Sequence, residues 1–202
     1  QVHAGGGTLT ASGQAGLEGE QAFELAARLS HFNPRLLFAE APVADLNLEL
    51  DGGGRLNPEA AGQIRFRFAP SQLRGQPLSG EGHLELAAGR LVVPSLGLDL
   101  AGNRIHVAGA LGGRGDHLRL EVDAPRLDAL GLGAGGRLKL SGQVGGSLDD
   151  PSAEFSGDAQ YLAWPGLARI GAVSLQGRLA PGRDGEVSLV LGASRLGLPG
   201  AG

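Results

Sequence analysis

The sequence predicts an all-β protein built as a long antiparallel or mixed sheet. Three observations lead to this prediction: apolar and polar residues alternate with a period of two in many segments, glycine-rich turns separate these segments, and helical periodicity is scarce. Glycine accounts for 37 of the 202 residues, well above its usual share of about 7%. We therefore expect a single continuous β segment over residues 1–202, with strands joined by short turns.

The first alternating segment covers residues 20–29, where Phe23, Leu25, Ala27 and Leu29 occupy every second position, although the segment also has helical propensity. Strand patterns then recur along the chain at 46–50, 63–68, 83–87, 117–123, 137–144, 173–179 and 186–191. Charged or polar residues fill most of the alternate positions in these segments. One face of the sheet is therefore predicted to be apolar and the other to meet water.

Turns are expected where glycine, aspartate and proline gather, namely at 51–54, 112–116, 133–136, 145–151 and 180–185. Prolines are expected at the ends of strands, where a missing N–H does least harm. Asn33 followed by Pro34 is a typical helix start, and Pro42 ends any helix within about two turns. At most one short helix is expected, near residues 33–41.

The composition argues against several classes of function. The net charge is −4 and aromatic residues make up 4% of the chain, so a nucleic-acid-binding surface is not expected. The chain has no cysteine, which excludes disulfides and thiolate metal sites and fits an oxidising cell envelope. No run of 18 apolar residues occurs, so no transmembrane helix is expected within these residues. Because Gln1 is not an initiator, we expect an internal fragment of a larger protein.

Candidate chemical motifs do not predict an enzyme. GLGAGG at 131–136 matches a dinucleotide-binding spelling, but a strand pattern follows it where a helix is required. GGRGD at 112–116 reads as a hairpin turn, and Asp149 and Asp150 read as turn residues before Pro151. The five histidines form no zinc-binding spacing. We expect no catalytic residues, no metal and no cofactor.

The apolar face raises the question of what covers it. A second sheet about 10 Å away would give a sandwich. A sheet that curls on itself would instead leave a trough lined by aliphatic side chains, and an open apolar trough points to a ligand or partner. The alternation alone leaves both readings open.

Three stretches, at 73–86, 98–113 and 118–146, occur in an order and spacing that resemble the TamB family, which is related to AsmA-like proteins. The likeness rests on the Gly-Asn-Arg turn at 102–104, the Gly-x-Leu-Gly at 109–112, the Asp-Ala-Pro-x-Leu step at 123–127 and the Phe-Asn-Pro at 32–34. It covers roughly residues 10–180. TamB-like proteins are anchored in the inner membrane of Gram-negative bacteria and carry a long periplasmic β body that is curled like a taco around an apolar groove.

The resemblance implies a segment of a periplasm-spanning conduit that shields phospholipid acyl chains and supports outer-membrane assembly. An Omp85-type (TamA-like) outer-membrane barrel is the implied partner of the parent protein, and outer-membrane protein clients are a further class of partner. We expect acyl chains to lie on the apolar positions Leu46, Leu48, Leu50, Ile64, Phe66, Phe68, Leu84, Leu86, Leu118, Leu120, Val122, Leu138, Leu140, Val173, Leu175, Val187, Leu189 and Leu191.

Three other readings stay open at this point. The chain could be a chaperone-like module that holds an unfolded β-barrel or autotransporter client by strand addition. It could be a structural adhesin or passenger domain with a closed and filled core. A carbohydrate-active enzyme would need carboxylates that converge in a cleft.

Overall fold

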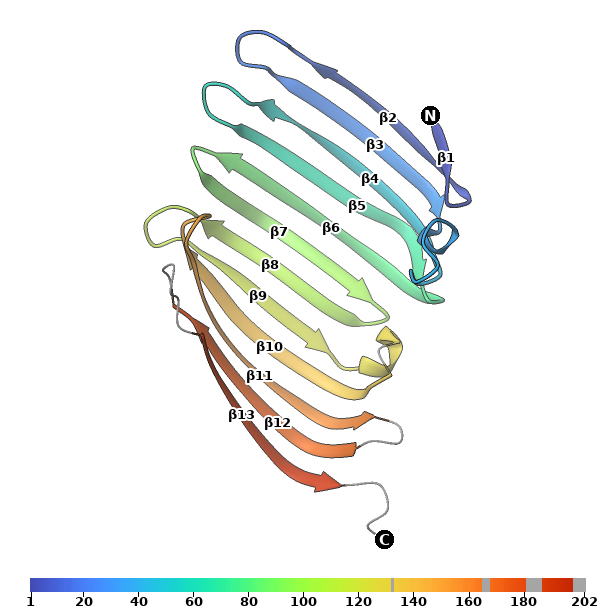
Figure 1. The fold of residues 1–202 in the computed structure, drawn as a ribbon, viewed down its shortest axis with the longest axis vertical. Helices are drawn as coiled ribbons and strands as arrows, with labels where there is room; N and C mark the ends of the chain where they lie inside the picture. Colours follow the sequence, from blue (N-terminus) through green and yellow to red (C-terminus); the bar gives the residue numbers. More distant parts are fainter. Residues whose placement is uncertain (132, 165–167, 181–186, 198–202) are drawn as a thin grey trace. The chain divides into compact units, whose positions relative to one another are not determined.

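A computed structural model describes residues 1–131, 133–164, 168–180 and 187–197, and these form strands joined by short turns (Figure 1). Strands account for 72% of the chain, so the predicted all-β fold class is confirmed. The chain divides into two compact units, Gln1–Leu100 (unit 1) and Ala101–Gly202 (unit 2). Each unit is described by itself.

Unit 1 is an antiparallel meander in which each strand pairs with the next strand along the chain. Residues 23–29 of the segment at 20–29 belong to one of these strands, which confirms the strand prediction over the helical one for these residues. The strands are β1 (Val2–Ala4), β2 (Gly7–Ala15), β3 (Phe23–Phe32), β4 (Ala44–Arg55), β5 (Ala61–Leu73), β6 (Gln76–Ala87) and β7 (Arg90–Leu100).

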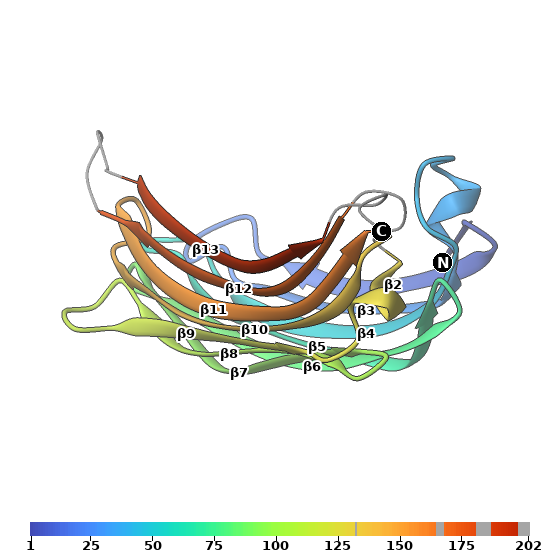
Figure 2. The ribbon, with the colours of Figure 1, turned by 90° about the horizontal axis from the view of Figure 1, so that it is seen from below.

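Unit 2 repeats this arrangement, again with antiparallel pairing between consecutive strands. Its strands are bent along their length, as Figure 2 shows for β10 to β13. Neither unit closes into a barrel. The strands are β8 (Asn103–Leu111), β9 (His117–Ala124), β10 (Gly135–Gly146), β11 (Pro151–Trp164), β12 (Ala168–Leu179) and β13 (Val187–Gly197).

Helical structure in the described residues is limited to two short 3-10 segments. The expected one is η1 (Pro34–Leu36), where the Asn33 side chain accepts a hydrogen bond from the backbone nitrogen of Arg35 at 3.2 Å. The other, η2 (Leu127–Leu130), was not expected and ends at Gly131, which has a left-handed backbone with φ 66°. It follows Pro125, which interrupts strand pairing after β9.

Two of the expected turns are in the expected places. Residues 112–116 join β8 to β9, and the Asp116 side chain accepts a hydrogen bond from the backbone nitrogen of Gly113 at 2.9 Å. Residues 147–150 join β10 to β11, with the Ser147 hydroxyl accepting from the nitrogen of Asp150 at 3.0 Å. Only residues 133–134 of the third expected turn precede β10. The expected turn at 180–185 lies, apart from residue 180, outside the described residues.

The expected turn at 51–54 is wrong, because these residues continue β4. Gly52 and Gly54 pair with Leu25 and Phe23 of β3 on one side and with β5 on the other. A Cβ atom at Gly54 would overlap the carbonyl oxygen of Ala61. Glycine stands here because neighbouring strands approach closely, not because the chain reverses.

Prolines had been expected at strand ends, but two of them lie inside strands. Pro70 lies in β5 between Phe68 and Ser71, where the pairing register shifts. Pro94 lies at the corresponding shift in β7. A β-bulge leaves one residue out of the hydrogen-bond ladder, so proline is tolerated there.

The sheets have no second layer within the described residues. The core consists almost entirely of small side chains: Ala44, Val93, Ala101, Ala110, Leu111, Ala124, Ala129 and Ala159. The accessible surface is 13053 Å², whereas two separate compact domains of half this mass would together expose roughly 10,700 Å². A single layer accounts for this excess, because its two faces both meet solvent.

Candidate functional site: an uncovered apolar sheet face

The register of unit 1 places its predicted lining residues on one face. Leu48 lies opposite Phe68, Leu50 lies opposite Phe66, and Ile64 lies opposite Leu84. Directly opposed residues of antiparallel strands project from the same face, and every second residue joins them. The residues on this face of unit 1 therefore include all eight predicted there: Leu46, Leu48, Leu50, Ile64, Phe66, Phe68, Leu84 and Leu86.

Unit 2 follows the same rule. Val122 lies opposite Leu140, and Leu175 lies opposite Leu191. The intervening strand β11 keeps the phase, because Leu140 and Leu175 both pair with Gly157. The predicted residues of this unit again share one face: Leu118, Leu120, Val122, Leu138, Leu140, Val173, Leu175, Val187, Leu189 and Leu191.

These side chains remain partly accessible to solvent. None of the eighteen is buried: Ile64, Val187, Leu189 and Leu191 are exposed, and the others are half-buried. Val187 is 73% exposed and Leu191 63%. Monomeric soluble proteins seldom leave so large a contiguous apolar surface open unless a ligand or partner covers it.

Several residues of the apolar face were not among those predicted. In unit 1, Leu25 and Leu29 of β3 pair with face residues of β4, and Leu96 and Leu98 of β7 pair with Gly82 and Gly80 of β6. In unit 2, Phe155 of β11 lies opposite Gly142 and Gly177. The same period-two signal was present in these segments. It was weak in β11, because the other face positions there are alanine and glycine.

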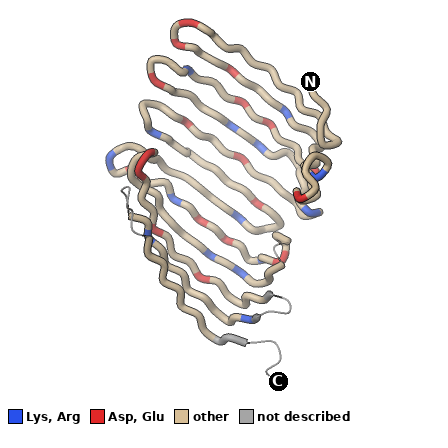
Figure 3. The backbone as a smooth tube through the Cα atoms, viewed as in Figure 1, with Lys and Arg blue, Asp and Glu red and all other residues tan. Residues whose placement is uncertain are grey.

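The pairing register places charged residues on the opposite face of each sheet. Figure 3 shows that the two signs are interspersed along the strands. In unit 1 a cross-strand row runs Arg28, Glu49, Arg67, Glu81, so that opposite charges face each other at each step. Arg28 Nη2 lies 2.6 Å from Glu49 Oε1, and Arg67 Nε lies 3.7 Å from Glu81 Oε2. Opposite charges directly across strands stabilise the pairing. This face is built to meet water.

Shallow hollows open on the charged face. One of about 520 Å³ in unit 2 is lined mostly by polar residues of β9 to β13, including Arg119, Glu121, Gln143 and Glu154. Glu121 and Glu154 are exposed, and Arg178 holds Glu154 at 3.2 Å. An exposed carboxylate paired with arginine is typical of a solvated strand face.

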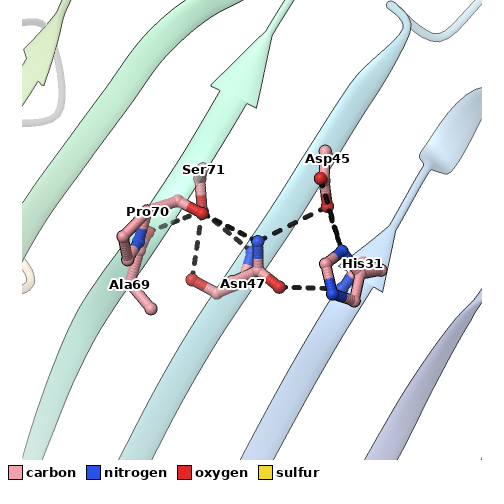
Figure 4. A network of polar contacts seen from close by, with 6 residues as sticks. All are labelled: His31, Asp45, Asn47, Ala69, Pro70 and Ser71. Carbon is pink, nitrogen blue, oxygen red and sulfur yellow. Dashed lines mark hydrogen bonds and ion pairs between the residues drawn. The ribbon is translucent and has the colours of Figure 1, made fainter.

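A polar network joins β3, β4 and β5 at one end of unit 1 (Figure 4). The Asn47 side chain accepts from the backbone nitrogen of His31 at 2.9 Å and donates to the carbonyl oxygen of Pro70 at 2.8 Å. Ser71 binds the backbone of Asn47, and Asp45 lies 3.0 Å from His31 Nδ1. Sequence reasoning did not find this network.

The network lies where the register shifts between all three strands. The shifts fall between Leu29 and Phe32, between Asp45 and Leu48, and between Phe68 and Ser71. Bulges leave backbone groups without a ladder partner and increase the local twist. The Asn47 and Ser71 side chains supply partners for these backbone groups, so the network stabilises the irregular part of the three strands.

Among the described residues, no cluster of three or more histidine, aspartate or glutamate side chains is placed to hold a metal ion. Within the same part of the chain, no helix has the length and apolar character needed to span a membrane.

Comparison with known proteins identifies the family. The model of the TamB N-terminal domain matches residues 1–200. The chain belongs to the TamB family. TamB proteins span the periplasm and belong to a transport and assembly module rather than to a known class of enzymes. Searches of curated proteins and of solved structures returned no match.

Proposed function

We propose that residues 1–202 form one segment of a TamB conduit in the periplasm, in which the apolar faces of the two units shield phospholipid acyl chains between the inner and outer membranes. The observation that carries this proposal is the uncovered apolar face, which is present in both units and lined by partly exposed Leu, Val, Ile and Phe side chains. The parent protein is anchored in the inner membrane and meets an Omp85-type barrel.

The magnitude of the hydrophobic effect supports a lipid as the ligand. Each buried methylene contributes about 0.8 kcal/mol, so a chain of roughly 16 carbons carries more than about 10 kcal/mol of transfer free energy. A continuous aliphatic surface offsets most of this term without any catalytic group. The conduit therefore acts passively, by lowering the desolvation barrier along its length.

Photo-crosslinking in living cells tests the proposal. A photoreactive amino acid is placed in the full-length protein at Leu120, on the apolar face, and separately at Arg119, on the charged face. We expect phospholipid adducts at Leu120 and none at Arg119. Absence of lipid at both sites, with the protein folded and the probe active, contradicts the proposal.

A substitution within the face gives a functional test. Leu120→Asp places a carboxylate on the acyl track, where desolvation of an unpaired charge is costly. We expect the full-length variant to fail in complementing a strain that lacks the protein. Leu120→Asn at normal abundance is a control for polarity without charge. Complementation by Leu120→Asp at the wild-type level would count heavily against a lipid track.

The uncovered apolar face also fits a second candidate function. Val187, Leu189 and Leu191 of β13 are exposed on this face. An unfolded outer-membrane protein has apolar strand faces of its own, which such a surface could hold away from water. This supports a chaperone-like role toward outer-membrane proteins. Crosslinks from Leu189 to nascent barrel proteins, with none from Leu120 to lipid, would favour this role over lipid transport.

A further inference from the structure

In unit 1 a glycine takes the place of a side chain where an aromatic ring lies against the sheet. Phe66 of β5 lies opposite Gly82 of β6. A Cβ atom at Gly82 would overlap Cε1 of Phe66 and would come within 2.7 Å of Cζ of the same ring. Gly82 has no positive φ in this structure. The absent methyl group, and not an unusual backbone, is therefore what this position provides.

Unit 2 contains the same relationship. Phe155 of β11 lies opposite Gly177 of β12. A Cβ atom at Gly177 would overlap Cζ of Phe155 and would lie 2.6 Å from both Cε1 and Cε2. The three outer atoms of the ring surround this single point, so the ring covers the glycine rather than standing away from the sheet. Both phenyl rings are half-buried although no second layer covers them.

Large and small residues alternate along the cross-strand row that contains Gly177. In unit 2 the row reads Leu120, Gly142, Phe155, Gly177, Leu189. In unit 1 Leu96 of β7 also leans toward Gly82, with its Cγ 3.2 Å from the Cβ that glycine lacks. Side chains therefore lie sideways into glycine gaps. The side chains of this face therefore project less far from the sheet than they would if every position carried a side chain that points away from the backbone.

We infer that Gly82 and Gly177 are positioning residues that hold the rings of Phe66 and Phe155 down on the sheet and so keep the apolar floor free for an acyl chain. The inference rests on the proposed lipid function. A methyl group at either glycine would lift the ring by displacing it into the space above the floor. The ring would then occupy the volume through which the chain passes.

Phe66 also lies beside a second aromatic ring of its own strand. Its ring meets that of Phe68 edge-on, with ring centroids 6.2 Å apart and an interplanar angle of 80°. Phe68 of β5 lies opposite Gly80, a second glycine of β6. Phe68 and Leu96 therefore limit sideways movement of a displaced Phe66 ring, which favours movement away from the sheet.

The test uses the full-length protein with a photoreactive residue at Leu84, two positions from Gly82 on the same face. Adduct yield is compared for wild type, Gly82→Ala, the double variant Gly82→Ala/Phe66→Leu, and Gly97→Ala. Gly97 is a matched control, because a Cβ atom there meets nothing within 4 Å and the residue lies on the charged face. A second probe at Leu120 reports on unit 2.

We expect Gly82→Ala to lower the lipid adduct yield at Leu84 several-fold while Gly97→Ala leaves it unchanged. The shorter leucine in the double variant should restore the yield, which a general loss of stability would not do. Adducts at Leu120 in the Gly82→Ala protein should stay at the wild-type level if the effect is local to the floor.

The outcomes separate this inference from the function on which it rests. Wild-type adducts at Leu84 that persist unchanged in folded Gly82→Ala overturn the role of the glycine and leave lipid binding intact. Absence of adducts at both probes in the wild type overturns lipid binding itself. If Gly82→Ala alone does not accumulate, the double variant decides: normal abundance with normal adducts supports the inference, and any other result contradicts it.

Discussion

The hydroxyl oxygen of Ser71 lies 2.8 Å from the backbone nitrogen of Asn47, so a side chain of β5 completes the pairing that β4 loses opposite the bulge in β5. The same oxygen lies 2.9 Å from the carbonyl oxygen of Ala69 and 3.2 Å from that of Asn47. Ser71 is 5% exposed. Water therefore has little access to replace these hydrogen bonds if the hydroxyl is removed.

Ser71→Ala should lower the free energy of unfolding by about 1–3 kcal/mol, the usual effect of leaving a buried polar group without a partner. Urea or thermal unfolding measures the change. Ser79→Ala, on the exposed face of β6, is the matched control and should stay within about 0.5 kcal/mol of wild type. Equal effects of the two substitutions would mean that the Ser71 hydrogen bonds do not stabilise the fold.

The ion pair between Arg28 and Glu49 should contribute little despite its short distance of 2.6 Å. The two side chains are 68% and 47% exposed, and solvent-exposed pairs contribute about 0.2–1 kcal/mol. A double-mutant cycle with Arg28→Ala and Glu49→Ala should give a coupling energy in this range. The coupling should shrink as salt is raised. A coupling of several kcal/mol, or one indifferent to salt, would contradict an exposed charged face.

Leu111 and Leu120 provide a comparison of a covered and an uncovered leucine in the same unit. Leu111 is 6% exposed, whereas Leu120 is half-buried on the apolar face. Leu111→Ala should destabilise the protein by about 2–4 kcal/mol. Leu120→Ala should cost only about 1 kcal/mol, because water already reaches the side chain. Equal losses in unfolding experiments would indicate that another layer covers the face, as in a sandwich.

Gly54→Ala should destabilise the protein by about 1–3 kcal/mol, since the added methyl group overlaps the carbonyl oxygen of Ala61 and the strands must separate to admit it. Gly97→Ala should be neutral or stabilising by up to about 1 kcal/mol, because it restricts the unfolded chain without meeting any atom. Thermal unfolding of both variants checks the contrast. A stable Gly54→Ala protein would mean that β4 and β5 have room to spare.

The period-two pattern was sufficient to predict the fold class and the phase of each strand. Leu46, Leu48 and Leu50 alternate with charged and polar residues, and every residue predicted on the apolar face lies on that face in its unit. The alternation of apolar and polar residues can be recognised within a single strand, without knowledge of the neighbouring strands. The face of each residue follows from its position in the alternation, because a shift of one residue reverses the face. The family was identified from short phrases that recur in order, such as residues 102–104 and 123–127.

The positions of the glycines and the network at Asn47 could not be predicted, because they depend on which residues the register places opposite each other. Gly52–Gly54 resembles a turn in the sequence, and only the pairing with β3 and β5 reveals a strand. Asn47 and Ser71 are 24 positions apart in the chain. Their contact depends on three register shifts that leave no periodic trace in the sequence.

Because every strand in a unit pairs only with its chain neighbours, the fold can grow or shrink one hairpin at a time. Neighbouring strands are about 4.8 Å apart, so each added hairpin lengthens a sheet by roughly 10 Å. A hairpin inserted between two existing hairpins continues both faces if its strands alternate apolar and polar residues in the same phase as their neighbours. Duplication of hairpins is therefore a simple evolutionary route by which a TamB protein could be fitted to the distance it must bridge.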